Sequence, residues 1–238
     1  MSVVLSRAGG LARLAVALPA ACALVLTVGA AAPAPAEGRA AVPAGAPLVN
    51  NGSFEWPWSP GSTELGVGST IGAWRVTGGS VDLVGVNSFW PAFKGRQSVD
   101  LTGTEPGTIQ QVIPTLPGRC YNVVFALAGN TYGGPVIKRG YVRVSQGPLI
   151  VQKNFAFDTT DKSPQDMGYV KEGFGFCSQG ERAILRFVSA TAGAYGPVID
   201  DVVVMPRFHP LDLHAGSIKL GPDEADLDNH VAIPGNGD

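Results

Sequence analysis

The chain has 238 residues, with 17 lysines and arginines against 19 aspartates and glutamates, and a formal net charge of −2 at pH 7. It contains no basic stripe and no aromatic residues interleaved with lysines, which argues against nucleic-acid binding. The histidines, His209, His214 and His230, all lie near the C-terminus. The body of the chain therefore lacks a histidine that could act as a base or a zinc ligand.

Residues 1–36 have the pattern of a secretory signal peptide. Arg7 and Arg13 precede an apolar run from 14 to 32, and small residues after the run offer cleavage sites. A short membrane anchor is the competing interpretation. Cys22 lies in a poor lipobox, which argues against a lipoprotein. Cleavage would remove two of the 17 basic residues and none of the 19 acidic ones, leaving a formal charge of −4.

The remainder divides into a linker, one domain and a tail. Residues 37–47 are rich in alanine, proline and glycine, and we interpret them as a linker. Residues 48–206 form the predicted domain, which is long enough to bury one substantial core. Residues 207–238 are acidic, lack periodicity and contain no apolar stretch or sorting motif, so we expect a flexible tail. We therefore expect a secreted protein that leaves the membrane after signal cleavage.

Short alternating stretches predict β-strands from the start of the domain. Residues 48–55 suit a short first strand, and 71–77 and 80–84 flank the glycine pair at 78 and 79 in the manner of a hairpin. Trp74, within the second stretch, is expected in the core.

The rest of the domain continues the same pattern, and 120–128 is its longest apolar run, expected at the centre of a sheet. The other predicted strands are 97–101, 107–113, 140–145, 155–158, 169–176, 182–189 and 198–204. About ten strands, punctuated by turns and accompanied by no amphipathic helix, predict an all-β fold, an antiparallel β-sandwich.

The last predicted strand contains two consecutive acids. Alternation places Asp200 on one face and Asp201 on the other, among valines and an isoleucine. An aspartate on a covered sheet face needs a partner, either hydrogen-bond donors or a cation.

Two loops share a pattern of Ala-Gly, tyrosine, glycine and Pro-Val-Ile. They are 128–137 and 190–199. Because each lies at a strand end, both could form one rim of the sandwich, although such loops can also recur by chance in a chain with 32 glycines.

Cys120 and Cys177 are the cysteines left after signal cleavage, and an even count in an exported chain indicates a disulfide. A bridge between positions so far apart stabilises the fold by about 4 kcal/mol in the chain-entropy model.

Loop aromatics and short polar side chains indicate where a sugar could bind. Sugars are recognised by an aromatic face against their C–H surface together with hydrogen bonds to their hydroxyls. The predicted ligand-binding residues are Trp90, Tyr132 and Tyr195, with Asn130 and Gln97 as polar partners; Trp56 and Trp58 are second choices. Packing at the edge of the core is the alternative role for each.

Several segments, in order along the chain, carry a resemblance to a known family. They are 51–55 (NGSFE), 79–84 (GSVDLV), 97–101 (QSVDL), 128–130 (AGN), 157–160 (FDTT), 191–197 (TAGAYGP) and 200–202 (DDV). Together they resemble the extracellular domain of unknown function of plant cell-wall proteins and its bacterial relatives, the "choice-of-anchor C" proteins. The resemblance covers 48–204.

This resemblance implies a galactose-binding-like jelly roll that binds cell-wall polysaccharide without catalysis and, in plants, interacts with pectin-modifying enzymes. Bacterial relatives often end in a surface anchor, a pattern absent here. The resemblance also implies a structural Ca²⁺ held by the Gly52 carbonyl, Glu55 and Asp200, a set of hard oxygen ligands that suits this ion. Alternatively, Asp200 accepts backbone N–H groups and Glu55 is a solvated charge.

The sequence thus predicts a secreted, non-catalytic carbohydrate-binding module whose partner is a wall polysaccharide or another glycan. An extracellular structural or adhesive protein that binds protein partners is the alternative. A polysaccharide hydrolase is a distant third, because aspartates at strand ends more often accept turn or capping hydrogen bonds than act in catalysis. The available carboxylates are Asp82, Asp100, Asp158, Asp200 and Asp201.

Overall fold

A computed structural model describes residues 48–85 and 88–207. Within these ranges the regular secondary structure consists of β-strands. Accordingly, no helix of the described part is long and apolar enough to span a membrane. The predicted signal peptide, the linker and the tail from residue 208 onward lie outside the described residues.

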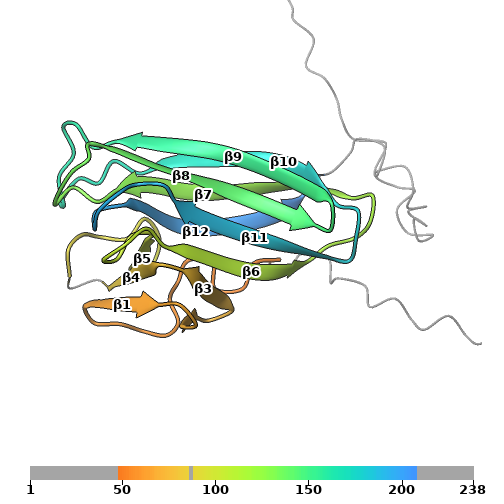
Figure 1. The fold of residues 1–238 in the computed structure, drawn as a ribbon, viewed down its shortest axis with the longest axis horizontal. Helices are drawn as coiled ribbons and strands as arrows, with labels where there is room; N and C mark the ends of the chain where they lie inside the picture. Colours follow the sequence, from red (N-terminus) through yellow and green to blue (C-terminus); the bar gives the residue numbers. More distant parts are fainter. Residues whose placement is uncertain (1–47, 86–87, 208–238) are drawn as a thin grey trace, which may run out of the picture. The chain divides into compact units, whose positions relative to one another are not determined.

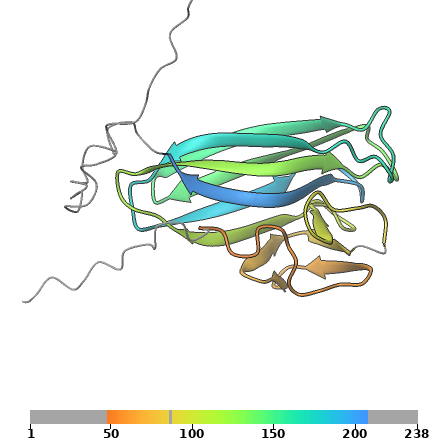
Figure 2. The ribbon, with the colours of Figure 1, turned by 180° about the vertical axis from the view of Figure 1, so that it is seen from behind.

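The strands form two antiparallel sheets of six strands each (Figures 1 and 2). Sheet A has the order β1 (Ser62–Gly66), β4 (Ser80–Gly85), β5 (Gln97–Asp100), β12 (Pro197–Pro206), β7 (Cys120–Gly129) and β10 (Val170–Cys177). Sheet B has the order β2 (Thr70–Ile71), β3 (Trp74–Gly78), β6 (Thr108–Pro114), β11 (Arg182–Ser189), β8 (Ile137–Gln146) and β9 (Leu149–Asp158).

The eight strands from β5 to β12 have the connectivity of a jelly roll. β5, β12, β7 and β10 form one four-stranded layer, and β6, β11, β8 and β9 form the other, so the chain repeatedly crosses between the sheets. This is the double Greek-key arrangement of jelly rolls. The predicted antiparallel β-sandwich is confirmed.

The core lies between the sheets and contains Trp74, as predicted. Its ring centroid lies 5.7 Å from that of Phe54 and 5.9 Å from that of Phe187, and its Nε1 donates to the Asn51 carbonyl over 3.1 Å. The indole is thus buried with its one polar group paired, as burial of a tryptophan requires.

Residues 48–55 form turns rather than the predicted strand. Asn51 and Phe54 have left-handed backbones, with φ of 54° and 58°. The Asn50 backbone pairs with the Gln111 side chain through both its N–H and its carbonyl. Leu48, Val49 and Phe54 are nevertheless buried. The apolar residues of this segment therefore close one side of the core without joining a sheet.

The predicted hairpin around residues 78 and 79 is wrong. β3 pairs with β2 and β6 in sheet B, whereas β4 pairs with β1 and β5 in sheet A. Gly79 has φ of 54°, and a Cβ there would overlap the Pro106 carbonyl. The turn therefore carries the chain from one sheet to the other. A second turn, with Gly72 at φ 61°, separates β2 from β3.

A β-bulge in β12 places both aspartates on the same side. The pairing with β7 shifts between Asp200 and Val203, and Asp201 has φ of 44°. Lys94 contacts both acids: its backbone N–H donates to Asp200 over 2.8 Å, and its ammonium pairs with Asp201 over 2.8 Å. The prediction of opposite faces is wrong, because a bulge adds one residue to the alternation. The predicted kinds of partner, a donor and a cation, are both present.

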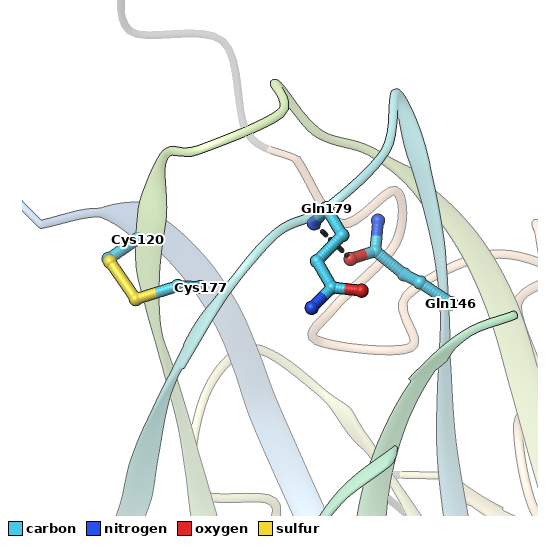
Figure 3. Close-up of a disulfide and its surroundings, with 4 residues drawn as sticks. All are labelled: Cys120, Gln146, Cys177 and Gln179. Atoms are coloured by element: carbon cyan, nitrogen blue, oxygen red, sulfur yellow. Dashed lines mark hydrogen bonds between the residues drawn. A yellow bond between two sulfur atoms is a disulfide. The ribbon is translucent and has the colours of Figure 1, made fainter. Parts of the chain in front are cut away.

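The predicted disulfide is confirmed. Cys120 and Cys177 are register partners at the ends of β7 and β10, and the bridge joins these strands (Figure 3). Nearby, the Gln146 side-chain carbonyl accepts the Gln179 backbone N–H over 2.9 Å (Figure 3). The disulfide therefore closes the end of β7 that lies opposite Asn130.

Candidate functional site

The two Gly-Tyr loops, 130–136 and 190–196, lie side by side where β7 ends and β12 begins. The Asn130 N–H donates to the Gly196 carbonyl over 2.9 Å, and a Cβ on Gly133 would overlap the Tyr195 ring. The expectation of a single rim is thus met. The side chains of Tyr132 and Tyr195 remain 52% and 39% exposed.

A cavity of about 370 Å³ opens between these loops and the neighbouring end of sheet A. Its lining residues are Glu64, Asp82, Phe89, Gly103, Thr104, Asn130, Tyr132, Ala194 and Tyr195. Its size lies within the range of small-ligand sites, and it combines aromatic walls with polar and acidic groups.

Phe89 and Tyr132 form the aromatic wall of this cavity. Their ring centroids lie 5.3 Å apart in an edge-to-face arrangement. Trp90 lies behind them, 4% exposed, with its Nε1 donating to Ser98 Oγ over 3.0 Å. The prediction that Trp90 contacts the ligand is wrong, because its ring is covered and supports Tyr132. Phe89, which adjoins Trp90 in the same aromatic loop, was not among the predicted ligand-binding residues.

Asn130 shapes the rim from a buried position. Its Nδ2 donates to Asp100 over 2.8 Å, and its Oδ1 accepts the Tyr132 N–H over 2.9 Å. Asp100 is fully buried and also accepts the backbone N–H groups of Thr102 and Gly196. Asn130 therefore links the buried end of β5 to the loop that presents Tyr132, while also lining the cavity.

Three carboxylates follow one another across sheet A. Glu64 is the register partner of Asp82, and Asp82 is the register partner of Asp100. Directly opposite residues on antiparallel strands point to the same side of the sheet. We call Glu64, Asp82 and Asp100 the acidic row. The sequence missed Glu64 because the polar segment of β1 has no strand signal of its own.

The acidic row contains groups of different acidity. Burial, together with a smaller contribution from the Glu64 charge, raises the pKa of Asp82 to about 6. Hydrogen bonds from Ser80 and Thr104 lower the pKa of Glu64. Burial also raises the pKa of Asp100 to about 7, against the hydrogen bonds that it accepts. At neutral pH, Glu64 and Asp82 thus present negative charge to the cavity.

Gln97 does not face a ligand, contrary to the sequence prediction. It is fully buried, its Nε2 donates to the Phe54 and Pro57 carbonyls, and its Oε1 accepts the Ser59 N–H. Its amide therefore holds the loop from 54 to 59 in place. The second-choice residues Trp56 and Trp58 lie exposed on that loop.

The predicted calcium ligands already accept hydrogen bonds. The Gly52 carbonyl accepts the Val202 N–H over 2.8 Å, and Glu55 Oε1 accepts the N–H groups of Arg96 and Gln97. Glu55 is therefore not the solvated charge of the alternative interpretation. Burial raises the pKa of Asp200 to about 7, and the charges of Asp201 and Glu55 act in the same direction. Within residues 48–85 and 88–207, no cluster of three or more His, Cys, Asp or Glu side chains could hold a metal.

Residues 47–205 match the model of a family described as "Protein of unknown function (DUF642)". The chain belongs to this family. A curated relative is halomucin of Haloquadratum walsbyi (strain DSM 16790 / HBSQ001), 30% identical over 180 residues. The match covers 73% of this chain but only 2% of halomucin.

Similar solved structures include two carbohydrate-binding modules. TmCBM61 in complex with β-1,4-galactotriose is 20% identical, with a TM-score of 0.48, over 68% of this chain and 99% of that one. A family 35 module from Clostridium thermocellum is 14% identical, with a TM-score of 0.41, over 61% of this chain and 99% of that one. Likeness at this level of identity and TM-score does not indicate the function of this chain.

Proposed function

We propose that this domain binds carbohydrate, without catalysis, in the cavity between Tyr132 and Tyr195. The observation that carries the proposal is the pairing of two exposed tyrosine rings with acidic and amide groups around one cavity of ligand size. Aromatic faces pack on the C–H surfaces of sugars, and carboxylates and amides hydrogen-bond to the hydroxyls. Tyr132 and Tyr195 take the stacking role, and Glu64, Asp82 and Asn130 take the polar role.

The charge of the cavity selects among sugars. Carboxylates accept hydrogen bonds from hydroxyls, and such charge-assisted bonds contribute about 1.5–3 kcal/mol each. The same carboxylates repel a uronate. Glu64 and Asp82 therefore favour a neutral glycan, and we expect neutral wall polysaccharides to be retained in preference to acidic ones at this site.

Pull-down with insoluble and soluble neutral polysaccharides tests the proposal. Tyr132→Ala and Tyr195→Ala should each lower retention at least about tenfold, since each removes an aromatic contact with the sugar. Tyr141→Ala, which alters a tyrosine on sheet B, is the matched control and should bind like the unchanged protein. Retention that is insensitive to both cavity variants, or absent for every neutral polymer, would refute the proposal.

A hydrolase is the second candidate, and the Glu64–Asp82 pair favours it. The two side chains are register partners on adjacent strands, and their pKa values move in opposite directions. Facing carboxylates of contrasting acidity are the requirement for glycoside hydrolysis. Release of reducing ends by the unchanged protein, abolished by Glu64→Gln, would establish this activity. Binding without any such release supports the non-catalytic module.

The structural calcium stays a proposal, supported by the repulsion between two neighbouring carboxylates. Glu55 and Asp200 keep lone pairs beyond their present hydrogen bonds, and a cation would relieve the charge of both. Calcium, when bound with the help of the Gly52 carbonyl, would tie the start of the domain to β12. A higher melting temperature in Ca²⁺ than in EDTA, lost in Glu55→Gln, is the expected result; identical melting in both buffers would exclude the ion.

Export, the "choice-of-anchor C" relationship and a wall-modifying enzyme as partner also remain proposals that rest on the sequence. We propose that the protein acts outside the cell, where a free polysaccharide is accessible to the cavity. Detection of the protein in the culture medium with its N-terminus near residue 37 would support export. Retention of the intact N-terminus in the membrane fraction would favour the anchor.

A further inference from the structure

Five polar residues form one row across the outer face of sheet B. Consecutive register partners from β3 to β9 are Arg75, Gln110, Arg186, Arg143 and Gln152. Figure 1 shows β6, β11, β8 and β9 side by side in this order. Neighbouring strands lie about 4.8 Å apart, so the row extends over about 19 Å. We call these five residues the arginine row.

Two guanidinium groups of the row are held in fixed orientations. Arg186 donates through Nε and Nη2 to Gln110 Oε1, over 3.0 and 2.6 Å. Arg143 donates in the same way to Gln152 Oε1, over 3.0 and 2.7 Å. A guanidinium has five N–H donors, so one edge of each group remains able to grip a further acceptor.

The face has almost no negative charge to balance its arginines. The outward positions of β3, β6, β11, β8 and β9 hold five arginines, Arg75, Arg139, Arg143, Arg182 and Arg186, against one acid, Asp158. Throughout the described residues, the ion pairs all use lysines: Lys94–Asp201, Lys153–Glu172 and Lys171–Asp201. Arg186 and Arg143 are direct cross-strand partners, and like charges so placed destabilise a sheet. A bound anion would relieve that repulsion.

We infer that the arginine row binds an acidic polysaccharide, with Arg75, Arg143 and Arg186 holding its uronate carboxylates. A carboxylate is planar and matches the free edge of a guanidinium. A row of about 19 Å suits an extended chain with repeated charges better than a single small anion.

A nucleic acid fits this face less well. Single-stranded binders present free aromatic rings on which bases stack. Here the ring of Tyr141 is covered by the Arg143 guanidinium, whose carbon lies 5.1 Å from the ring centroid. The sequence prediction that the chain has no basic stripe holds along the chain but fails across the sheet.

Affinity electrophoresis of the full chain in gels containing polygalacturonate tests the inference. Arg143→Gln/Arg186→Gln should weaken retardation at least about tenfold, because it removes two charge-assisted contacts. Arg96→Gln/Arg207→Gln lowers the net charge equally at exposed positions outside sheet B and should behave like the unchanged protein. Added NaCl should weaken binding of the unchanged protein.

Further arms of the experiment distinguish this site from the cavity, and a uronate ligand from other polyanions. Arg143→Gln/Arg186→Gln should retain neutral polysaccharide normally, whereas Tyr132→Ala should retain polygalacturonate normally. Failure of the cavity proposal would thus leave this inference intact. No retardation by polygalacturonate, equal loss in both double variants, or stronger binding to dextran sulfate or duplex DNA than to polygalacturonate would overturn it.

Discussion

The cavity on sheet A and the outer face of sheet B are built by the same means and carry opposite charge. Each depends on cross-strand register: Glu64, Asp82 and Asp100 align on one sheet, and Arg75, Arg186 and Arg143 on the other. The acidic row lies beneath loops that add aromatic walls, whereas the arginine row lies on an open face. Under the two proposals above, one small sandwich would bind neutral and acidic parts of a glycan at separate surfaces.

Loss of the disulfide should have the largest effect, and it should affect both surfaces through their shared core. Cys120→Ser/Cys177→Ser should lower the free energy of unfolding by about 4 kcal/mol, because the bridge restricts the unfolded chain. Urea unfolding under non-reducing conditions measures this change. The unchanged protein should become equally unstable in reductant. A stability that reductant leaves unaltered would show that the bridge does not form.

Neutralising Glu64 and Asp82 should remove their negative charge from the cavity and leave the positive charge of sheet B in place. Glu64→Gln/Asp82→Asn should weaken retention of neutral polysaccharide about tenfold or more, because hydrogen bonds to carboxylates become hydrogen bonds to amides. The same variant should no longer exclude uronate oligomers from the cavity. Titration with neutral and uronate oligosaccharides checks both outcomes. Unaltered selectivity would show that these carboxylates do not face the ligand.

The pH of the solution should affect the stability contributions of the two surfaces differently, because Asp82 titrates and the arginines do not. Its pKa is raised from the ordinary 3.8 to about 6, so the folded state holds the proton more tightly than the unfolded state does. The contribution of Asp82 to stability is therefore greatest below about pH 4 and is lost as the pH rises through 6. In Asp82→Asn, the free energy of unfolding should fall by about 1 kcal/mol less than in the unchanged protein as the pH rises from about 4 to above 6. This value allows for the partial solvation of the Asp82 side chain.

Urea unfolding at pH 4.5 and 7.5 measures the effect. Arg143→Gln is the matched comparison on sheet B: since arginine stays charged over this range, its effect on stability should be the same at both pH values. An equal pH dependence in Asp82→Asn and the unchanged protein would contradict the assigned role of burial.

The smallest expected effect concerns the two ion pairs of Asp201, one of which ties the loop before β5 to sheet A. Asp201, whose side chain is 14% exposed, pairs with Lys94 and Lys171, whose side chains are 62% and 41% exposed. Asp201→Asn should cost less than about 1 kcal/mol, since exposed ion pairs contribute little. Asparagine suits the left-handed backbone at this position, so the change isolates the charge. Chemical unfolding in low and high salt should show the difference only at low salt; a difference that persists in high salt would point to another cause.

The sequence by itself predicted most strands and the disulfide, and it offered the meeting of the two Gly-Tyr loops as one of two interpretations. Residues 107–113 and 182–189 have a strand pattern and 120–128 is a continuous apolar run, and these segments lie in β6, β11 and β7 with boundaries within one residue. Alternation is a local property, so local sequence reveals it. The cysteine pair could be inferred because the predicted signal cleavage would leave no other cysteine.

Only the tertiary structure decided which strands pair and which side chains they bring together. β1 is polar and becomes a strand by pairing with β4, and the turn at Gly79 joins two sheets instead of a hairpin. The bulge in β12 shifts the alternation of Asp200 and Asp201 to one side. Burial of Trp90 and Gln97 depends on loops that arrive from elsewhere in the chain.

The acidic row and the arginine row follow from register between strands distant in sequence, which single-sequence periodicity does not encode. Glu64, Asp82 and Asp100 are separated along the chain by turns and loops, as are Arg75, Arg143 and Arg186. Each row forms because backbone hydrogen bonds set the partner of every residue once the core has fixed which strands are neighbours.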